Sequence, residues 1–247
     1  MHRIMRHGFI LAALAVAVAA GLPSAAPADA IDDALEMLNQ RHIAFTVGEF
    51  IDCVERNDFE NVQIFLRAGM DPNTPKNGVP MLIEISMRGY TDTVKALLEG
   101  GAATNVRNDR GWTPLHMAVF FSHIDVTQVL LERRADVSAR TEFGMTPLHY
   151  ATQERNVEMV ELLLKHGASA SVKSKSGVTP LSIAADLNEK PIVKVYTAHG
   201  FGARMKAIRE ERAAEEAAVK KEIKRKAAAR DAAFTERMKN ATGQGPQ

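Results

Sequence analysis

Cysteine and aromatic residues are scarce in this sequence. Its 247 residues include one cysteine, Cys53, which excludes an internal disulfide and a four-thiolate zinc site. Aromatic residues make up 6% of the chain, which is low for a β-sandwich or a barrel and suits a helical protein. The common catalytic motifs are also missing, among them the Gly-x-Ser-x-Gly elbow, the phosphate-binding loop and His-Glu-x-x-His. We therefore expect a mostly helical protein without enzymatic activity, cofactor or metal.

A surplus of charge of one sign is missing as well. The 31 Lys and Arg residues and the 30 Asp and Glu residues give a formal charge of +1, which excludes a strongly basic nucleic-acid binder. The charge is nevertheless divided along the chain: residues 31–202 hold 17 basic and 22 acidic residues, and residues 203–247 hold 12 and 7. We expect the acidic segment and the basic segment to attract each other, within one chain or between two copies, weakly and less so at high salt.

Long apolar runs are missing except near the N-terminus. Residues 9–20 form an unbroken apolar run of 12 residues, preceded by basic residues and followed by the small-x-small pattern Ala28-Asp29-Ala30. A run of this length is too short to cross roughly 30 Å of hydrocarbon as a helix. The pattern predicts a signal peptide over residues 1–30, a mature chain that starts at about Ile31, and no membrane span after cleavage. We expect a periplasmic protein; an uncleaved anchor and secretion into the medium are the alternatives.

A repeat of 33 residues is present in the middle of the chain. This interval separates Gly78, Gly111, Gly144 and Gly177. At a fixed offset the glycines are followed by the tetrapeptides Thr113-Pro114-Leu115-His116, Thr146-Pro147-Leu148-His149 and Thr179-Pro180-Leu181-Ser182. The same interval separates Ala118, Ala151 and Ala184, and also Leu97, Leu130 and Leu163. So many positions in one register indicate a chain built from stacked repeats.

The period and the Thr-Pro-Leu-His signature resemble the ankyrin repeat. The resemblance runs from Thr46 to about Gly200, and it implies a β-turn finger followed by two antiparallel helices in each unit. The expected fold is all-α with β-turn fingers, a solenoid of about five helix-turn-helix units followed by a long charged helix. The residues agree with this fold, because Thr can cap a helix, Pro fits its first turn, and Gly167 can end a second helix.

The repeat register sets the predicted domain boundaries. A signal peptide (1–30) and an N-terminal capping helix (31–45) precede the ankyrin-like segment (46–202), whose units span about 46–76, 77–109, 110–142, 143–175 and 176–202. A helix rich in Ala, Lys, Glu and Arg (203–239) and a flexible tail (240–247) follow. The outer units depart from the pattern; in the second unit, for example, Pro80 stands at the position of the capping Thr.

The segment 203–239 contains neither proline nor glycine and consists mostly of strong helix formers, so we expect one helix of roughly 55 Å. Its apolar residues are sparse, fall within an arc of about 120° on a helix, and several recur every eleven residues. They are Met205, Ile208, Val219, Ile223, Phe234 and Met238. A solvated charged helix, a docking or self-associating helix and a membrane-surface helix are the alternatives.

Histidines and the lone cysteine are the candidates for metal or redox chemistry. In the ankyrin family the signature histidine forms a hydrogen bond within its turn. The structural residues implied by the resemblance are therefore Thr113, Pro114, His116, Thr146, Pro147, His149, Thr179 and Pro180. A zinc site formed by His116, His149 and Cys53 would draw its ligands from separated units. We expect Cys53 to be a small buried residue, with redox sensing as the alternative.

Candidate binding residues come from positions that the repeat does not need for its core. A stacked array exposes a concave surface made of first helices and finger tips. Adjacent Phe120 and Phe121 fall on this surface, and exposed aromatic residues of this kind are candidate anchors for a partner. The full predicted set is Met87, Arg88, Trp112, Met117, Phe120, Phe121, Phe143, Tyr150, Gln153 and Glu154. Packing against the next unit, or under the C-terminal helix, is the alternative.

These expectations combine into an exported ankyrin-type module that binds another protein and no nucleic acid. Such a module could scaffold, stabilise or inhibit a periplasmic protein, and self-association through residues 203–239 remains open. The alternatives are a secreted effector that binds a host protein, an envelope-associated structural protein, and an enzyme or metal protein.

Overall fold

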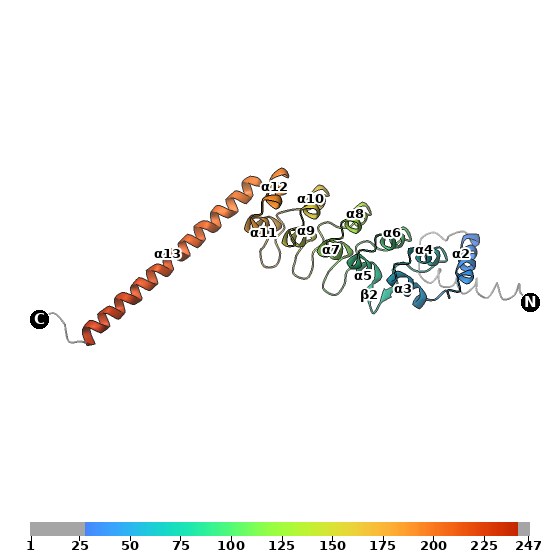
Figure 1. Cartoon of the computed structure of the whole chain (residues 1–247), viewed down its shortest axis with the longest axis horizontal. Helices are drawn as coiled ribbons and strands as arrows, with labels where there is room; N and C mark the ends of the chain where they lie inside the picture. Colours follow the sequence, from blue (N-terminus) through green and yellow to red (C-terminus); the bar gives the residue numbers. More distant parts are fainter. Residues whose placement is uncertain (1–27, 242–247) are drawn as a thin grey trace, which may run out of the picture. The chain divides into compact units, whose positions relative to one another are not determined.

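The computed structural model describes residues 28–241 (Figure 1). The predicted signal peptide up to residue 27, and residues 242–247 of the predicted tail, lie outside the described residues. The elements are α2 (Ala28–Gln40), α3 (Val47–Glu55), α4 (Phe59–Arg67), β1 (Pro75–Lys76), β2 (Val79–Pro80), α5 (Met81–Arg88), α6 (Thr91–Glu99), α7 (Pro114–Phe120), α8 (Ile124–Glu132), α9 (Pro147–Gln153), α10 (Val157–Lys165), α11 (Pro180–Leu187), α12 (Lys190–Ala198) and α13 (Gly202–Ala241).

The fold class is the predicted one, a series of helix-turn-helix units followed by a long C-terminal helix. Figure 1 shows the first helices α3, α5, α7 and α9 in one row and the second helices α4, α6, α8 and α10 in another, with the fingers extending from the row of first helices. The strands β1 and β2 pair antiparallel and form the finger of the second unit. The chain divides within α11, between Ile183 and Ala184, into two compact units.

The core of the stack is made of side chains that recur at the 33-residue interval. Leu97, Leu130 and Leu163 are fully buried in the second helices, and Ala118 and Ala151 are fully buried in the first helices. Small residues at the latter positions let α7 lie close to both α5 and α9. Burial of one leucine is worth about 1.5–3 kcal/mol, and it is achieved only between neighbouring units, so stability comes from the stacking.

The first helices begin where side chains satisfy their free backbone amides. Thr113 caps α7, and its Oγ1 accepts a hydrogen bond from the backbone N–H of His116 (3.4 Å). The Nδ1 of His116 accepts in return from the backbone N–H of Thr113 (3.3 Å). In the second unit Pro80 occupies the same position before α5 and forms no side-chain cap. The helix nevertheless forms, because its apolar face is buried against neighbouring helices.

The N-terminal helix α2 begins and ends earlier than the predicted 31–45. It spans Ala28–Gln40, so the predicted cleavage position after residue 30 lies in its first turn. Ala34 and Leu38 are buried where α2 contacts α4. This helix covers the apolar side that the first repeat would otherwise expose.

The start of α13 is anchored within the second compact unit. Met205 is buried, and Arg209 donates a hydrogen bond from Nε to the backbone oxygen of Ala185 (3.1 Å). Arg212 forms an ion pair with Asp186 at the end of α11. These contacts attach the first three turns of α13 to the last helix pair.

Beyond this anchor the helix is exposed to solvent. Every residue from 210 to 235 is exposed, including Val219 (58%), Ile223 (61%) and Phe234 (65%). The predicted apolar stripe is therefore divided: Met205 is buried and Ile208 is half-buried near its start, whereas Val219, Ile223 and Phe234 are exposed.

Candidate functional site: an aromatic surface on the first helices

Four aromatic side chains from two neighbouring units form a continuous group, here called the aromatic cluster. Trp112 precedes α7, Phe120 and Phe121 stand at its end, and Tyr150 lies in α9. The ring centroids of Trp112 and Tyr150 are 4.7 Å apart. Phe120 is edge-on to both rings, at 5.5 Å from Trp112 and 5.9 Å from Tyr150, and Phe121 lies 5.3 Å from Phe120. The structure thus brings together four of the ten predicted binding residues.

The aromatic cluster has a buried base and an exposed edge. Tyr150 is 8% exposed, and its hydroxyl lies 3.4 Å from the Oγ1 of Thr141. Phe120 and Phe121 are 38% and 47% exposed. Edge-to-face ring pairs contribute about 0.5–1.5 kcal/mol beyond the burial of their area, so the buried rings hold the exposed ones in place. A partner would meet preorganised rings, which lowers the entropy lost on binding.

Five other predicted residues take no part in the ring contacts of the aromatic cluster. Met87 and Met117 are half-buried, and Gln153 and Glu154 are exposed at the end of α9. Phe143 is 60% exposed in the finger before α9, and within the described chain it takes part in no aromatic pair. Phe143, Gln153 and Glu154 are thus accessible to a partner, and Met87 and Met117 are partly accessible.

Arg88, the last of the predicted set, is already engaged within the chain. Its guanidinium forms ion pairs with Glu84 and Glu55, the latter at 3.7 Å, and it donates to the backbone oxygen of Glu55 (3.3 Å). Lys76 also pairs with Glu55. Arg88 thus joins the first two units, and a partner would compete with these contacts.

The fingers next to the aromatic cluster carry a surplus of positive charge. Residues 105–111, 138–144 and 171–177 hold the five basic residues Arg107, Arg110, Arg140, Lys173 and Lys175. Against these stand the two acidic residues Asp109 and Glu142, a net charge of +3. Trp112 follows the first of these fingers, so the cluster adjoins a basic edge even though residues 31–202 are acidic in total.

The signature histidines are buried and connect neighbouring units. Nε2 of His116 lies 3.3 Å from the backbone oxygen of Met145, and Nε2 of His149 lies 3.1 Å from that of Val178. Burial lowers the pKa of His116 to about 4 and also lowers the pKa of His149. At neutral pH both imidazoles are uncharged, and both ring nitrogens are occupied by contacts within the protein.

Cys53 lies in the core and away from a reactive environment. It is 5% exposed, and burial, with Asp58 and Glu49 nearby, raises the pKa of its thiol to about 11. The thiolate is the reactive form, so the geometry disfavours redox sensing at neutral pH. In the part of the chain that the structure describes, no three His, Cys, Asp or Glu side chains group as metal ligands would.

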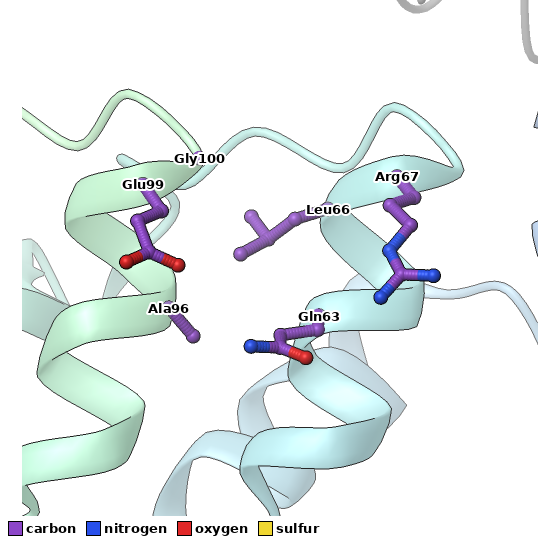
Figure 2. Close-up of a pocket in the computed structure, with 6 residues that line it drawn as sticks. All are labelled: Gln63, Leu66, Arg67, Ala96, Glu99 and Gly100. Carbon is purple, nitrogen blue, oxygen red and sulfur yellow. The ribbon is translucent and has the colours of Figure 1, made fainter. Parts of the chain in front are cut away.

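A shallow groove of about 330 Å³ lies between the second helices α4 and α6. Figure 2 shows Gln63 and Leu66 pointing from α4 toward α6, where Ala96 and Gly100 face them. The positions equivalent to Ala96 and Gly100 hold larger residues in the third unit. A Cβ added at Gly100 would lie 3.0 Å from Leu66. The groove therefore exists because the second unit has small residues there, and its polar rim is too sparse to define a ligand.

Comparison with known proteins agrees with this architecture. The chain matches the family described as ankyrin repeats (3 copies) over residues 50–141 and 134–206. The chain belongs to the ankyrin-repeat family. Ankyrin repeats are protein–protein interaction modules and are generally not enzymes. Between residues 28 and 241, no helix has both the length and the apolar character needed to cross a bilayer.

Three relatives show how far the similarity extends. Mouse protein phosphatase 1 regulatory subunit 27 is 34% identical over 94 residues, which cover 36% of this chain and 60% of that protein. A putative ankyrin repeat protein of Rickettsia bellii is 33% identical over 95 residues, covering 28% and 40% of the two chains. Alpha-latrocrustotoxin-Lt1a of Latrodectus tredecimguttatus is 39% identical over 71 residues, covering 28% and 5%. The chain thus spans at most 60% of the length of these relatives.

Sequence reasoning missed the side chains that join successive ankyrin fingers. Arg107 donates from Nη1 to the backbone oxygen of Arg140 (2.8 Å), and Arg140 donates from Nη2 to that of Lys173 (2.6 Å). Asn105 accepts from the backbone N–H of Asp136 (2.8 Å). The signal was available, because Arg107, Arg140 and Lys173 follow one another at the 33-residue interval.

Proposed function

We propose that this ankyrin-repeat protein is exported and binds a periplasmic protein through the aromatic cluster, as a scaffold, stabiliser or inhibitor. One observation carries the binding surface: Phe120 and Phe121 remain 38% and 47% exposed, while Phe120 contacts the rings of Trp112 and Tyr150 and Phe121 contacts Phe120. Neither position is needed for stacking, since the equivalent residues in the next unit are Gln153 and Glu154. Clustered, preorganised aromatic residues are typical of binding hot spots.

The charge next to the cluster indicates the chemistry of the partner. The basic fingers favour a segment with acidic residues beside one or two large apolar side chains. The apolar side chains would contact Phe120 and Phe121, and the acidic ones would lie toward Arg110 and Arg140. Weakened capture at high salt would support this electrostatic contribution.

The binding proposal is tested with the double variant Phe120→Ala/Phe121→Ala. Proteins captured from a periplasmic extract by the unaltered chain are quantified by mass spectrometry and compared with those captured by the variant. We expect the affinity for the specific partner to fall at least about tenfold. Phe59→Ala is the matched control, since Phe59 is 37% exposed but lies at the start of α4, away from the cluster. Equal capture by the folded double variant would refute the proposal.

Export is tested separately by cell fractionation and N-terminal sequencing. The motifs in residues 1–30 support a mature chain in the osmotic-shock fraction that begins at about Ile31. An unprocessed chain in the cytoplasm would contradict this. Accumulation in the culture medium would favour the alternative, a secreted effector that binds a host protein.

A further inference from the structure

The exposed apolar residues of α13 fall on a regular set of helix positions, here called the frame. Val219, Ile223 and Phe234 are 58–65% exposed and are spaced by four and eleven residues. Extended in both directions, the frame has successive spacings of three, four and four residues, a period of eleven that keeps one face aligned along a nearly straight helix. Its positions are Met205, Ile208, Arg212, Glu216, Val219, Ile223, Ala227, Arg230, Phe234 and Met238.

The spacing of these positions is nearly symmetric about the middle of the helix. Positions 219 and 223, 212 and 230, and 208 and 234 are each symmetric about residue 221. Two copies of α13 placed antiparallel and centred there would bring Val219 of each copy opposite Ile223 of the other, and Phe234 opposite Ile208. An apolar pattern that matches its own reverse is what a two-fold symmetric contact requires.

The charges on the helix favour the same direction. Residues 210–216 hold four glutamates and one arginine, and residues 220–230 hold six basic residues and one glutamate. A parallel, in-register pair would put Glu216 against Glu216 and Arg230 against Arg230. In the antiparallel pair, each Glu215 lies near Lys226 of the other copy and each Glu216 lies near Lys224, on the two flanks of the frame. Arg212, which lies across from Arg230, is already paired with Asp186 of its own chain.

We propose that residues 208–234 of α13 associate antiparallel with the same segment of a second copy of this chain. Three exposed apolar side chains per copy, with flanking ion pairs, make a small contact, so the dimer is weak and weakens further at high salt. A membrane surface is a poorer occupant, because Glu216 and Arg230 interrupt the apolar face. The dimer is independent of the aromatic cluster and presents two copies of it.

The association is tested by sedimentation equilibrium of the purified protein over a range of concentrations. We expect a monomer–dimer equilibrium whose dissociation constant rises at least about tenfold in Ile223→Asp. The matched control is Ala214→Asp, which adds the same charge on the opposite face of the helix and leaves the dissociation constant nearly unchanged. Circular dichroism confirms that both variants keep α13 helical. A monomer at every concentration, or equal dissociation constants for Ile223→Asp and the unaltered chain, would overturn the proposal.

The direction of pairing is tested by disulfide formation in a Cys53→Ala background, which removes the chain's one cysteine. Chains with Glu216→Cys are mixed with chains with Ala227→Cys and oxidised. In the antiparallel pair these two positions lie within one residue of being opposite, whereas two copies of position 227 are roughly 18 Å apart along the helix axis, beyond the reach of a disulfide. We expect the mixed disulfide to predominate. Preferential linkage between identical positions, or a statistical mixture, would refute the antiparallel arrangement.

Discussion

Single residues in this protein act across the boundary between units. His116 caps its own helix through Nδ1 and reaches the backbone oxygen of Met145 in the next finger through Nε2. The expectation from the resemblance covered only the hydrogen bond within the turn. The second contact could not be derived locally, because it depends on how the next finger lies against α7. Ser182 holds the equivalent position in the fifth unit and forms only the local hydrogen bonds with Thr179.

The burial of His116 predicts a loss of stability in acid. The folded pKa, about 4, lies below the usual value of about 6.5, so the unfolded chain binds more protons between these two pH values. The free energy of unfolding therefore falls as pH is lowered from about 6.5 to 4, by up to about 3 kcal/mol from this residue. Urea denaturation at a series of pH values measures the slope.

The variant His116→Ser reproduces the natural residue of the fifth unit without the titrating ring. We expect it to be less stable at pH 7 and to have a smaller pH slope between 4 and 6.5. His166→Ser is the control, since His166 is exposed at the end of α10. An unchanged slope in the His116 variant would show that other groups cause the acid sensitivity.

At the scale of elements, the second helices end in the same backbone conformation although their sequences differ. Gly69, Gly101, Gly167 and Gly200 have φ between +85° and +94°. The third unit has Arg134 at this position, and its φ is +61°. A non-glycine residue costs roughly 1–2 kcal/mol in this region. The stacking of the unit therefore imposes a conformation that its own residue disfavours.

Replacing this arginine should stabilise the protein. We expect Arg134→Gly to raise the free energy of unfolding by about 0.5–1 kcal/mol, because glycine adopts the conformation without strain but loses more entropy on folding. Chemical denaturation of both proteins measures the difference. The reciprocal change, Gly167→Arg, tests the same cause in the next unit and should lower the free energy of unfolding by a similar amount. Destabilisation by Arg134→Gly would mean that the interactions of the arginine side chain stabilise the fold by more than the strain of its backbone conformation destabilises it.

At the scale of the whole molecule, the two compact units differ in how much of their apolar surface is buried. Among the described residues of the first unit, most large apolar side chains are packed in the stack, and the exposed ones include Phe120 and Phe121 of the aromatic cluster. The second has a packed part, which includes the buried residues Ile192, Tyr196 and Met205, followed by a helix exposed from residue 210 to residue 235. The first arrangement suits binding by a rigid surface, and the second suits association through a helix.

Removal of residues 214–247 should leave the last helix pair intact, because the anchoring residues Met205, Arg209 and Arg212 remain. Hydrogen exchange of α11 and α12 at low protein concentration is expected to be nearly the same in the shortened chain. Met205→Ala should instead destabilise this pair by about 2–3 kcal/mol, since it deletes a buried side chain. Faster exchange in α12 after truncation alone would show that the distal helix stabilises it.

Local patterns in the sequence determined the repeat, the helix-turn-helix units, the capped helix starts and the long charged helix. They suffice because helix capping by Thr-Pro and the propensity of helix formers depend only on residues near one another in the sequence, and the repeat presents the same local pattern in each unit. Stacking decided the rest: which rings contact Trp112 and Tyr150, where Nε2 of His116 binds, and that Arg134 adopts a glycine conformation. The ring and hydrogen-bond contacts join residues about 30 positions apart in the sequence, and the backbone conformation of Arg134 depends on contacts of this kind. Their free energy comes from surfaces that exist only when neighbouring units are packed together.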